Sequence, residues 1–372
     1  MSVRKRVLKD GEVAWQVDYR DGAGIRRHHQ FKTKREAEAF HAKARTEVAA
    51  GVHTPDSASI TVNEASELWL ARCEREGLEA LTIVDYRRHL KLHILPYIGR
   101  TKLARLTVPA INSFRDRLLD DGRSPDMVRR VLGSLAALVG DAQGRGLVAV
   151  NNVRAITRGK RGARTEKQRL VMPTRDELRA IIAATPDRHR ALIFTALFAG
   201  LRSSELRGLS WDCVDLKQGQ IEVRQRADRH NRLGPPKSKA GMRTIPMSPL
   251  LLNTLKAWRL ASPKSELNLV FPNGAGRFEN HSNILWRIFW PIQITAGVTV
   301  IRDGKPDAKY SLHALRHACA ALWIEQGFGP KRIQTLMGHA SVAQTFDVYG
   351  YLFEAREADT AAMAAITAKL VD

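Results

Sequence analysis

The segment SLHALRH, residues 311–317, is the most informative stretch of this 372-residue chain. On a helix, His313 and Arg316 share one face, so both side chains can donate hydrogen bonds to one anion. His313 and His317 also have the i,i+4 spacing of a metal-binding pair. No general-base glutamate directly follows His313 and no third ligand is evident, so an anion site is a better interpretation than a metal site.

Two upstream segments carry further groups suited to an anion. AGLRSSEL, residues 199–206, begins a predicted helix and places Arg202 and Glu205 on one face. A buried structural Arg–Glu pair would have the same spacing. PKSK, residues 236–239, lies in a basic loop between two predicted strands. Neither segment is specific when it is taken alone.

A fourth segment, LMGH at residues 336–339, precedes a tyrosine at a defined distance. Tyr349 follows His339 by ten residues. A second tyrosine, Tyr351, lies two residues further on, and only the spacing from His339 selects between the two. A single histidine or tyrosine is more often structural than functional. The order and spacing of the four segments together therefore carry the functional prediction.

The composition favours a polyanionic partner. Lys and Arg number 60 against 38 Asp and Glu, which gives a net charge of +22 and a pI near 10.4. A hydrophobic fraction of 44% excludes a wholly disordered chain. Cys73, Cys213 and Cys319 form no CxxC pair, which argues against a disulfide framework or zinc finger and indicates a reducing compartment. The apolar stretch near 191–201 is shorter than the about 20 residues of a membrane span, and the polar N-terminus lacks a signal-peptide core.

Periodicity predicts a small sheet-and-helix domain over residues 1–55. Residues 15–31 alternate between apolar and polar around a glycine-bearing turn, which is typical of a β-hairpin. Thr33 and Glu36 then form a capping box for a helix that ends near Gly51. This domain is interpreted as a DNA-contacting module, with a solubilising appendage as the alternative. The residues predicted to contact DNA here are Arg4, Lys5, Arg6, Arg26 and Arg27.

Residues 60–152 are predicted to be all-helical, since apolar residues recur there at helical spacing. A capping signal at Thr61 starts the first helix. The later helical stretches are 82–94, 108–119 and 126–142. Residues 153–169 form a basic linker that would suit a phosphate backbone, although a solvated charge run would look the same. Its predicted DNA contacts are Arg158, Lys160, Arg161 and Arg164.

Residues 170–372 are predicted to be mostly helical with one β-hairpin. The strands are expected at 220–226 and 244–247. Lys239 and Arg243 belong to the basic loop between them and are further predicted DNA contacts. The fold class is therefore multidomain α+β, mainly α with small β elements.

The order Arg, Lys, His-x-x-Arg, His, Tyr within one basic domain resembles the phage-type integrases of the tyrosine recombinase family. The residues that carry this match are Arg202, Lys237, His313, Arg316, His339 and Tyr349. The match covers residues 170–372. LKLHILP, residues 90–96, is similar to the helical core-binding (SAM-like) domain of that family, and residues 1–55 are similar to its arm-binding three-stranded module.

The resemblance implies phosphodiester transfer through a 3′-phosphotyrosine at Tyr349. Arg202 and Arg316 would clamp the non-bridging oxygens of the pentavalent phosphorane, for which a planar guanidinium is well suited. His313 would hydrogen-bond the phosphate and assist proton transfer at Tyr349. Glu205 would hold Arg202 and His313 in place.

The resemblance also assigns the leaving-group acid. Lys237 would protonate the departing 5′ oxygen, and His339 would be a further phosphate donor. Ser238 follows Lys237 where a threonine is more usual in the family. Lys239 could reach the same oxygen from the same hairpin, so the choice between the two lysines stays open.

The implied function is the integration or excision of a prophage or genomic island. A phosphotyrosine conserves the energy of the phosphodiester, so no nucleotide, metal or cofactor is expected. The implied partners are double-stranded DNA with core-type and arm-type sites, other protomers in a tetramer on DNA, an excision factor and a host DNA-bending protein. No membrane partner is expected, and the expected location is cytoplasmic, at the nucleoid. The tail from Asp359 could pack on its own domain or on a neighbour's.

Two alternatives to recombination stay open. One is nicking and resealing of the type IB topoisomerase kind, because the same pocket would relax supercoils when no partner duplex is present. The other is a catalytically silent DNA-binding protein. The complete set of catalytic residue types argues against the silent protein, and the arm-like first domain favours integration.

Overall fold

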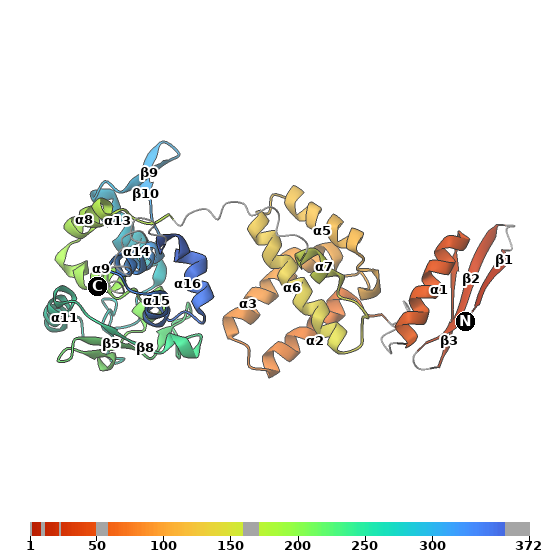
Figure 1. Ribbon diagram of the computed structural model, residues 1–372, viewed down its shortest axis with the longest axis horizontal. Helices are drawn as coiled ribbons and strands as arrows, with labels where there is room; N and C mark the ends of the chain where they lie inside the picture. The colour runs from red at the N-terminus through yellow and green to blue at the C-terminus, as the bar shows by residue number, and fades with distance from the viewer. Residues whose placement is uncertain (1, 9–11, 22–23, 50–58, 159–170, 354–372) are drawn as a thin grey trace, which may run out of the picture. The chain divides into compact units, whose positions relative to one another are not determined.

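The computed structural model (Figure 1) divides into two compact units, Met1–Thr165 and Glu166–Asp372. Among the described residues, no helix combines the length and the apolar character needed to cross a membrane. The residues that the structure describes are 2–8, 12–21, 24–49, 59–158 and 171–353.

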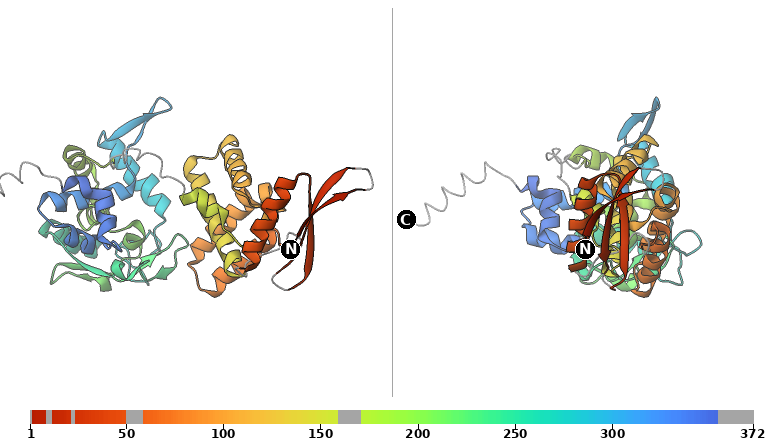
Figure 2. Two further views of the ribbon diagram at one scale, coloured as in Figure 1. Left: turned by 45° about the vertical axis from the view of Figure 1, so that its right-hand side comes forward. Right: turned by 90° about the vertical axis from the view of Figure 1, so that its right-hand side faces the viewer.

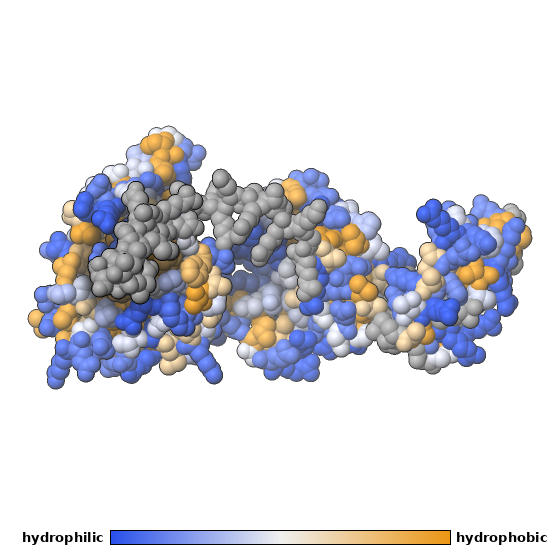
Figure 3. Space-filling model, in the orientation of Figure 1, coloured by the Kyte–Doolittle hydropathy of each residue, from blue (hydrophilic) through white to orange (hydrophobic). Residues whose placement is uncertain are grey.

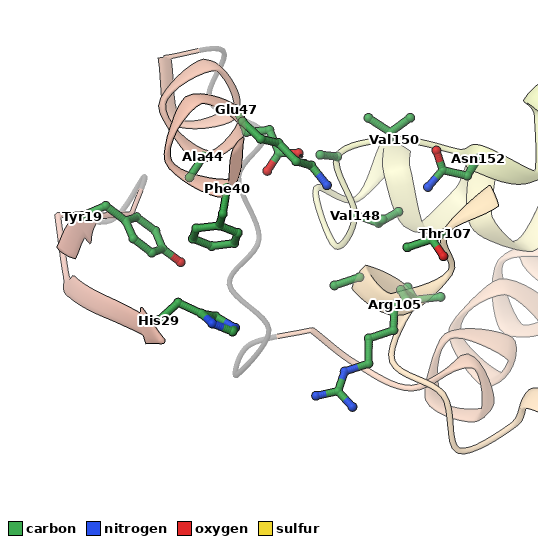
Figure 4. A pocket seen from close by; sticks show the side chains of 14 residues that line it. Tyr19, His29, Phe40, Ala44, Glu47, Arg105, Thr107, Val148, Val150 and Asn152 are labelled. Carbon is green, nitrogen blue, oxygen red and sulfur yellow. Dashed lines mark ion pairs between the residues drawn. The ribbon is translucent and has the colours of Figure 1, made fainter. Parts of the chain in front are cut away.

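The N-terminal module is a three-stranded antiparallel sheet with a helix against one face (Figure 2). Val17 and Tyr19 of the central strand are buried. The ring of Phe40 on the helix lies 5.8 Å from the ring of Tyr19 and 5.1 Å from that of His29 (Figure 4). The predicted hairpin and helix are confirmed, and β1 is the third strand that the family resemblance implied. The elements are β1 (Ser2–Val7), β2 (Val13–Arg20), β3 (Arg26–Phe31) and α1 (Lys34–Ala49).

The strand register sorts the basic residues of this module onto two faces of the sheet. Val17 and Tyr19 of β2 face α1, so the even-numbered positions of β2 and their cross-strand partners lie on the open face. The basic residues on this open face are Arg4, Arg6, Arg20 and Arg26. Lys5 and Arg27 lie on the helix side, where the guanidinium of Arg27 pairs with Asp21 at 2.9 Å. The single basic cluster predicted from the sequence is therefore split.

The rest of the first unit is a helical bundle around one apolar core. Its first helix begins at the predicted capping box, in which the Thr61 backbone N–H donates to Glu64 at 2.7 Å. The predicted helix at 82–94 is divided, because Leu90–Ile94 form a π-helix ahead of Pro96, which has no N–H to donate. The elements are α2 (Val62–Arg75), α3 (Ala80–His89), η1 (Leu90–Ile94), α4 (Leu95–Ile98), η2 (Leu103–Arg105), α5 (Val108–Asp120), α6 (Pro125–Gly144) and α7 (Asn152–Arg158).

The second unit is mostly helical, and its core surrounds α9 and α14, which pack against each other. Residues 191–197 of α9 are all buried, which explains why this run carries no polar face in the sequence. The helices and helical turns are α8 (Arg175–Ala184), α9 (Asp187–Phe198), α10 (Ser203–Arg207), η3 (Trp211–Cys213), η4 (Lys239–Gly241), α11 (Pro249–Ala261), α12 (His281–Asn283), η5 (Ile284–Phe289), α13 (Trp290–Thr295), α14 (Leu312–Glu325), α15 (Pro330–Met337), α16 (Val342–Tyr349) and η6 (Gly350–Leu352).

The predicted β-hairpin of this unit is present with different bounds. β5 pairs with β8, but β5 ends at Val223 because its partner strand begins at Arg243. Arg226, the last residue of the predicted strand at 220–226, instead begins β6, which pairs with β7 in a small second hairpin. A further hairpin, β9 with β10, was not predicted; it projects from the unit (Figure 1) and carries the exposed Ile301. The space-filling view shows apolar surface on this projection (Figure 3). The strands are β4 (Val214–Asp215), β5 (Gln220–Val223), β6 (Arg226–Ala227), β7 (Leu233–Gly234), β8 (Arg243–Pro246), β9 (Thr299–Arg302) and β10 (Lys305–Ala308). The predicted fold class is confirmed.

Candidate active site

Arg316 lies on the buried side of α14 and is 3% exposed. Its guanidinium donates hydrogen bonds to the carbonyl oxygens of Gly200 and Met337. Gly200 has a φ of +59°, and a Cβ at this position would lie 3.0 Å from Sγ of Cys319, so glycine is required for both reasons. Arg316 therefore joins the loop after α9 to the end of α15. Burial and the positive charge of Arg202 lower the pKa of Arg316 to about 9, which still leaves a cation at neutral pH.

Arg202 is the N-cap residue of α10, and its predicted pairing with Glu205 is present. Nη1 of Arg202 donates to Oε1 of Glu205 at 2.8 Å, and the Arg202 backbone N–H donates to Oε2 at 2.9 Å. Nη2 donates to the carbonyl oxygen of Gly338 at 2.8 Å. The side chain of Arg202 is 33% exposed. Arg202 thus faces solvent while its geometry is set by Glu205 and the end of α15.

Arg243 is buried and bonded to groups of the protein, so the structure lends no support to the prediction that it contacts DNA. Its side chain is 1% exposed, and its two Nη atoms donate to both carboxylate oxygens of Glu205 at 3.1 and 2.8 Å. Arg243 lies two residues before the buried Ile245 on β8, so strand alternation turns both side chains to the core. The second partner of Glu205 is therefore Arg243 and not His313 as predicted.

This shared carboxylate stays ionised. Burial by itself would raise the pKa of Glu205, but the hydrogen-bonded Arg243 and the charges of Arg202 and Arg316 lower it to about 2. Three guanidinium groups around one carboxylate leave a local charge of roughly +2. The region around α10 and the end of α15 is therefore suited to a phosphate group.

Tyr349, at the end of α16, is brought into contact with two histidines. A hydrogen bond of 2.7 Å joins its hydroxyl to Nδ1 of His317, and its ring stacks on His339 with 6.3 Å between centroids. The ring of His313, which is exposed, lies 4.5 Å from that of His317. Tyr349 is 1% exposed, and burial raises the pKa of its hydroxyl. Tyr349 is therefore held as a protonated phenol.

The histidines of the site are neutral at pH 7. Burial first, and then the charges of His313 and Arg316, lower the pKa of His317 to about 4. Burial and the charges of Arg316 and Arg202 lower the pKa of His339 to about 4 as well. A neutral His317 can share the Tyr349 proton, because one ring nitrogen then has a free lone pair.

These two histidines predict a pH-dependent stability. Between pH 6.5 and about 4, His317 and His339 are protonated in the unfolded chain but stay neutral in the folded chain, because folding lowers their pKa values. The free energy of unfolding should therefore fall as the pH is lowered from about 6.5 to about 4, with no contribution from them above 6.5. Thermal melting of the purified chain between pH 8 and 4.5 measures this. His339→Asn should flatten the dependence, and an unchanged slope in that variant would contradict the assignment.

Both candidate lysines lie at the surface. Lys237 lies in the loop between β7 and β8, and Lys239 begins η4 in the same loop; both are exposed. Both candidates for the leaving-group acid thus lie on an accessible loop, and the role itself and the choice between the two lysines stay predictions. Among the described residues, no group of three His, Cys, Asp or Glu side chains lies close enough together to hold a metal ion.

The remaining predicted DNA contacts belong to the first unit of the chain. Arg4, Lys5, Arg6, Arg26 and Arg27 belong to the N-terminal module. Lys160, Arg161 and Arg164 lie outside the described residues, as does the tail from Asp359, and only the backbone of Arg158 is described, at the end of α7. The contacts that two residues make in the site were missed in the sequence. His317 was considered only as a metal ligand, and Arg243 could have been found from its alternation with Ile245.

Models of protein families match both units of the chain. The model of the phage integrase family matches residues 172–356, and the model of the phage integrase N-terminal SAM-like domain matches residues 61–119. The chain is 25% identical to the ICEBs1 integrase of Bacillus subtilis (strain 168), over 97% of this chain and 98% of that protein. It is also 25% identical to a XerC-like tyrosine recombinase of Caldanaerobacter subterraneus subsp. tengcongensis, over 95% of this chain and 96% of that protein.

Solved structures share the fold. The Tn1549 transposon integrase in complex with a circular intermediate DNA superimposes with a TM-score of 0.69 at 18% identity, over 83% of this chain and 100% of that one. A lambda integrase tetramer bound to a Holliday junction gives a TM-score of 0.58 at 20% identity, over 91% of this chain and 95% of that one. Together with the family models and the convergence of Arg202, Arg316, His339 and Tyr349, these matches establish that the chain belongs to the phage integrase family and is a tyrosine recombinase, an enzyme of site-specific DNA recombination.

Proposed function

We propose that this chain integrates or excises a mobile DNA element by cutting and rejoining attachment sites, with Tyr349 as the nucleophile. The observation that carries this proposal is the meeting of Arg202, Arg316, His339 and Tyr349 around the end of α15, from four separate segments of the chain. Relatives of nearly equal length that include an ICEBs1 integrase support an integrating element as the substrate.

The proposed step exchanges one phosphoester bond for another. The Tyr349 oxygen bonds to phosphorus, the bond from phosphorus to the 5′ oxygen breaks, and the product is a 3′-phosphotyrosine with a free 5′ hydroxyl. Arg202 and Arg316 stabilise the negative charge that develops on the non-bridging oxygens. Each guanidinium has five N–H groups, so the hydrogen bonds to carbonyls and Glu205 leave donors for the phosphate.

Two proton transfers accompany this step. Tyr349 must lose its proton, and the acceptor at hand is the neutral His317 beside it, whose ring is in turn in contact with that of His313. The departing 5′ oxygen takes a proton from Lys237. Because Tyr349 is 1% exposed, attack requires α16 to move the phenol outward from the contact with His317. A 5′ hydroxyl from another duplex reverses the sequence and reseals the strand, so strand transfer needs neither nucleotide nor metal.

The leaving-group role of Lys237 has a selective test. Lys237→Ala should lower cleavage by about 10²–10⁴-fold, because the 5′ oxygen then departs unprotonated. A 5′-bridging phosphorothiolate, whose sulfur needs no acid, should restore cleavage by Lys237→Ala but not by Arg316→Ala. Single-turnover adduct formation measures both. Rescue of Lys239→Ala in place of Lys237→Ala would move the acid to Lys239.

We propose four functional parts: an arm-type DNA-binding domain at 1–55, a core-binding domain at 60–152, a basic linker at 153–169 and the catalytic domain at 170–372. In the first part, the open face of the sheet carries arginines without the packing that covers the other face. A lambda integrase tetramer on a Holliday junction supports a tetramer on DNA for this chain too. An excision factor and a host DNA-bending protein would set the direction of recombination.

Removal of residues 1–55 tests the arm-type assignment. A chain beginning near Ser59 should still cleave a core-site duplex through Tyr349, while it loses footprints on flanking arm sequences and integrates poorly. Each phosphate contact contributes about 0.9 to the log–log salt slope of duplex binding, so the slope should become shallower. An unchanged salt slope and integration efficiency would instead make the first domain a stabilising or partner-binding module.

A further inference from the structure

Three arginines bind three consecutive carbonyl groups at the C-terminal end of α15. Nε of Arg243 donates to the Leu336 oxygen at 2.7 Å, Arg316 donates to the Met337 oxygen, and Arg202 donates to the next one along the chain at 2.8 Å. The last carbonyls of a helix lack intrahelical partners and carry a partial negative charge. The end of α15 therefore acts as a common support for all three guanidinium groups.

Of these three arginines, Arg243 has the fewest N–H donors left for a phosphate, because four of its five are bonded within the protein, against two each for Arg202 and Arg316. Its side chain is 1% exposed and makes four hydrogen bonds: two to Glu205, one to Leu336 and one to the Gly241 carbonyl at 2.9 Å. Glu205 in turn receives two hydrogen bonds from Arg202. A chain of direct contacts thus runs from Arg243 through one carboxylate to an arginine of the phosphate clamp.

The packing around Arg243 leaves little room for another arrangement. Gly338 has a φ of +62°, and a Cβ on it would lie 3.0 Å from both Nη1 of Arg243 and the Ala240 carbonyl oxygen. The turn that follows Lys237 is therefore pressed against the end of α15, with Arg243 between them. This close approach explains why position 338, in the LMGH segment, is occupied by a glycine.

We propose that Arg243 is a positioning residue for strand cleavage, which fixes the guanidinium of Arg202 through the shared carboxylate of Glu205. The inference rests on the clamp role proposed above for Arg202. An ammonium cannot replace it, because a lysine lacks the planar fork that reaches both carboxylate oxygens and two carbonyls together. Without Arg243, the Glu205 carboxylate is free to shift. The Arg202 guanidinium is then no longer held in the position from which it donates to the phosphate.

Arg243→Lys in the full chain tests this role. The substrate is a nicked suicide duplex whose core site is taken from the DNA flanking the reading frame. Binding of the duplex should change less than about threefold, while the single-turnover rate of adduct formation should fall by about 10²-fold. Wild-type adduct formation by a folded Arg243→Lys would overturn the proposal.

A matched control separates positioning from a general effect of a buried arginine. Arg207 is also buried and also binds carbonyls, those of Glu279 at 2.6 Å and Asp228 at 2.9 Å, but its bonds do not include Glu205. Arg207→Lys, compared at a temperature where both variants are folded by circular dichroism, should cleave at close to the wild-type rate. An equal loss in both variants would mean that Arg243 is only structural.

A phosphorothiolate substrate identifies the partner through which Arg243 acts. If Arg243 positions Arg202, a sulfur leaving group should not restore cleavage by Arg243→Lys. Restoration would assign its role to the Lys237 loop and overturn the proposal. If Arg243→Lys does not fold, the double variant Glu205→Gln/Arg243→Gln keeps a neutral hydrogen-bonded pair in place of the ion pair. That variant should bind and not cleave; normal cleavage by it would equally overturn the proposal.

The failure of this inference differs from failure of the proposed function. An adduct that persists in Tyr349→Phe would contradict the function itself. Normal cleavage by Arg243→Lys, together with loss of the adduct in Tyr349→Phe, would contradict only the role of Arg243.

Discussion

Tyr349→Phe should abolish the covalent protein–DNA adduct while DNA binding stays unchanged. The phenol oxygen is the only atom removed, and the stacking of the ring on His339 is preserved. The variant leaves Nδ1 of the half-buried His317 without its 2.7 Å partner, which costs at most about 1–3 kcal/mol of stability, the range found for a fully buried group. The adduct should be measured on a nicked suicide duplex by denaturing electrophoresis, well below the melting temperature of the variant.

Tyr351→Phe is the matched control for this experiment. Tyr351 lies on η6, two residues after Tyr349, and is half-buried. Its hydroxyl is the alternative nucleophile that the sequence left open, and the ring contacts with His317 and His339 belong to Tyr349. Tyr351→Phe should therefore form the adduct normally. A persistent adduct in Tyr349→Phe with loss in Tyr351→Phe would move the nucleophile to Tyr351.

Arg202→Lys and Arg316→Lys should each lower cleavage by about 10²–10³-fold with little change in DNA binding. Each guanidinium holds carbonyl oxygens of the protein with some of its N–H groups and would hold the phosphate with the others. A lysine keeps the charge but has only three donors on one atom, so it cannot do both. Single-turnover kinetics at saturating protein separate the cleavage rate from the affinity.

Arg179→Lys gives the control for this pair of variants. Arg179 lies on α8, forms an exposed ion pair with Asp176 and is 75% exposed, so its replacement should change neither binding nor cleavage. Equal losses of affinity and rate in Arg202→Lys and Arg316→Lys would show instead that both residues are ordinary backbone contacts. If only one of the two variants lost cleavage, the arginine replaced in the other variant would not belong to the phosphate clamp.

Much of the fold was predictable because its signals are local. The capping box of Thr61 and Glu64 sets the start of α2 within a single turn, and alternation over 15–31 sets the hairpin of β2 and β3. Each of these signals is complete within a few residues. The exit of the chain from β5 at Val223 was not predictable in this way, because it depends on where a partner strand begins at Arg243.

For the catalytic set, the types, order and spacing of the residues determined the family and its candidate nucleophile, through resemblance. They did not determine which of the basic residues is buried. Arg243 is 38 residues from Glu205 and 93 from Leu336, and its burial follows from contacts that only the packed domain creates. The pairing of His317 with Tyr349 likewise spans 32 residues and depends on how α15, which packs against both α14 and α16, brings them together. Charge and spacing along the chain thus predicted a phosphate site, and tertiary packing decided which of the charged side chains are exposed and which are buried against one another, because burial is a property of the assembled domain.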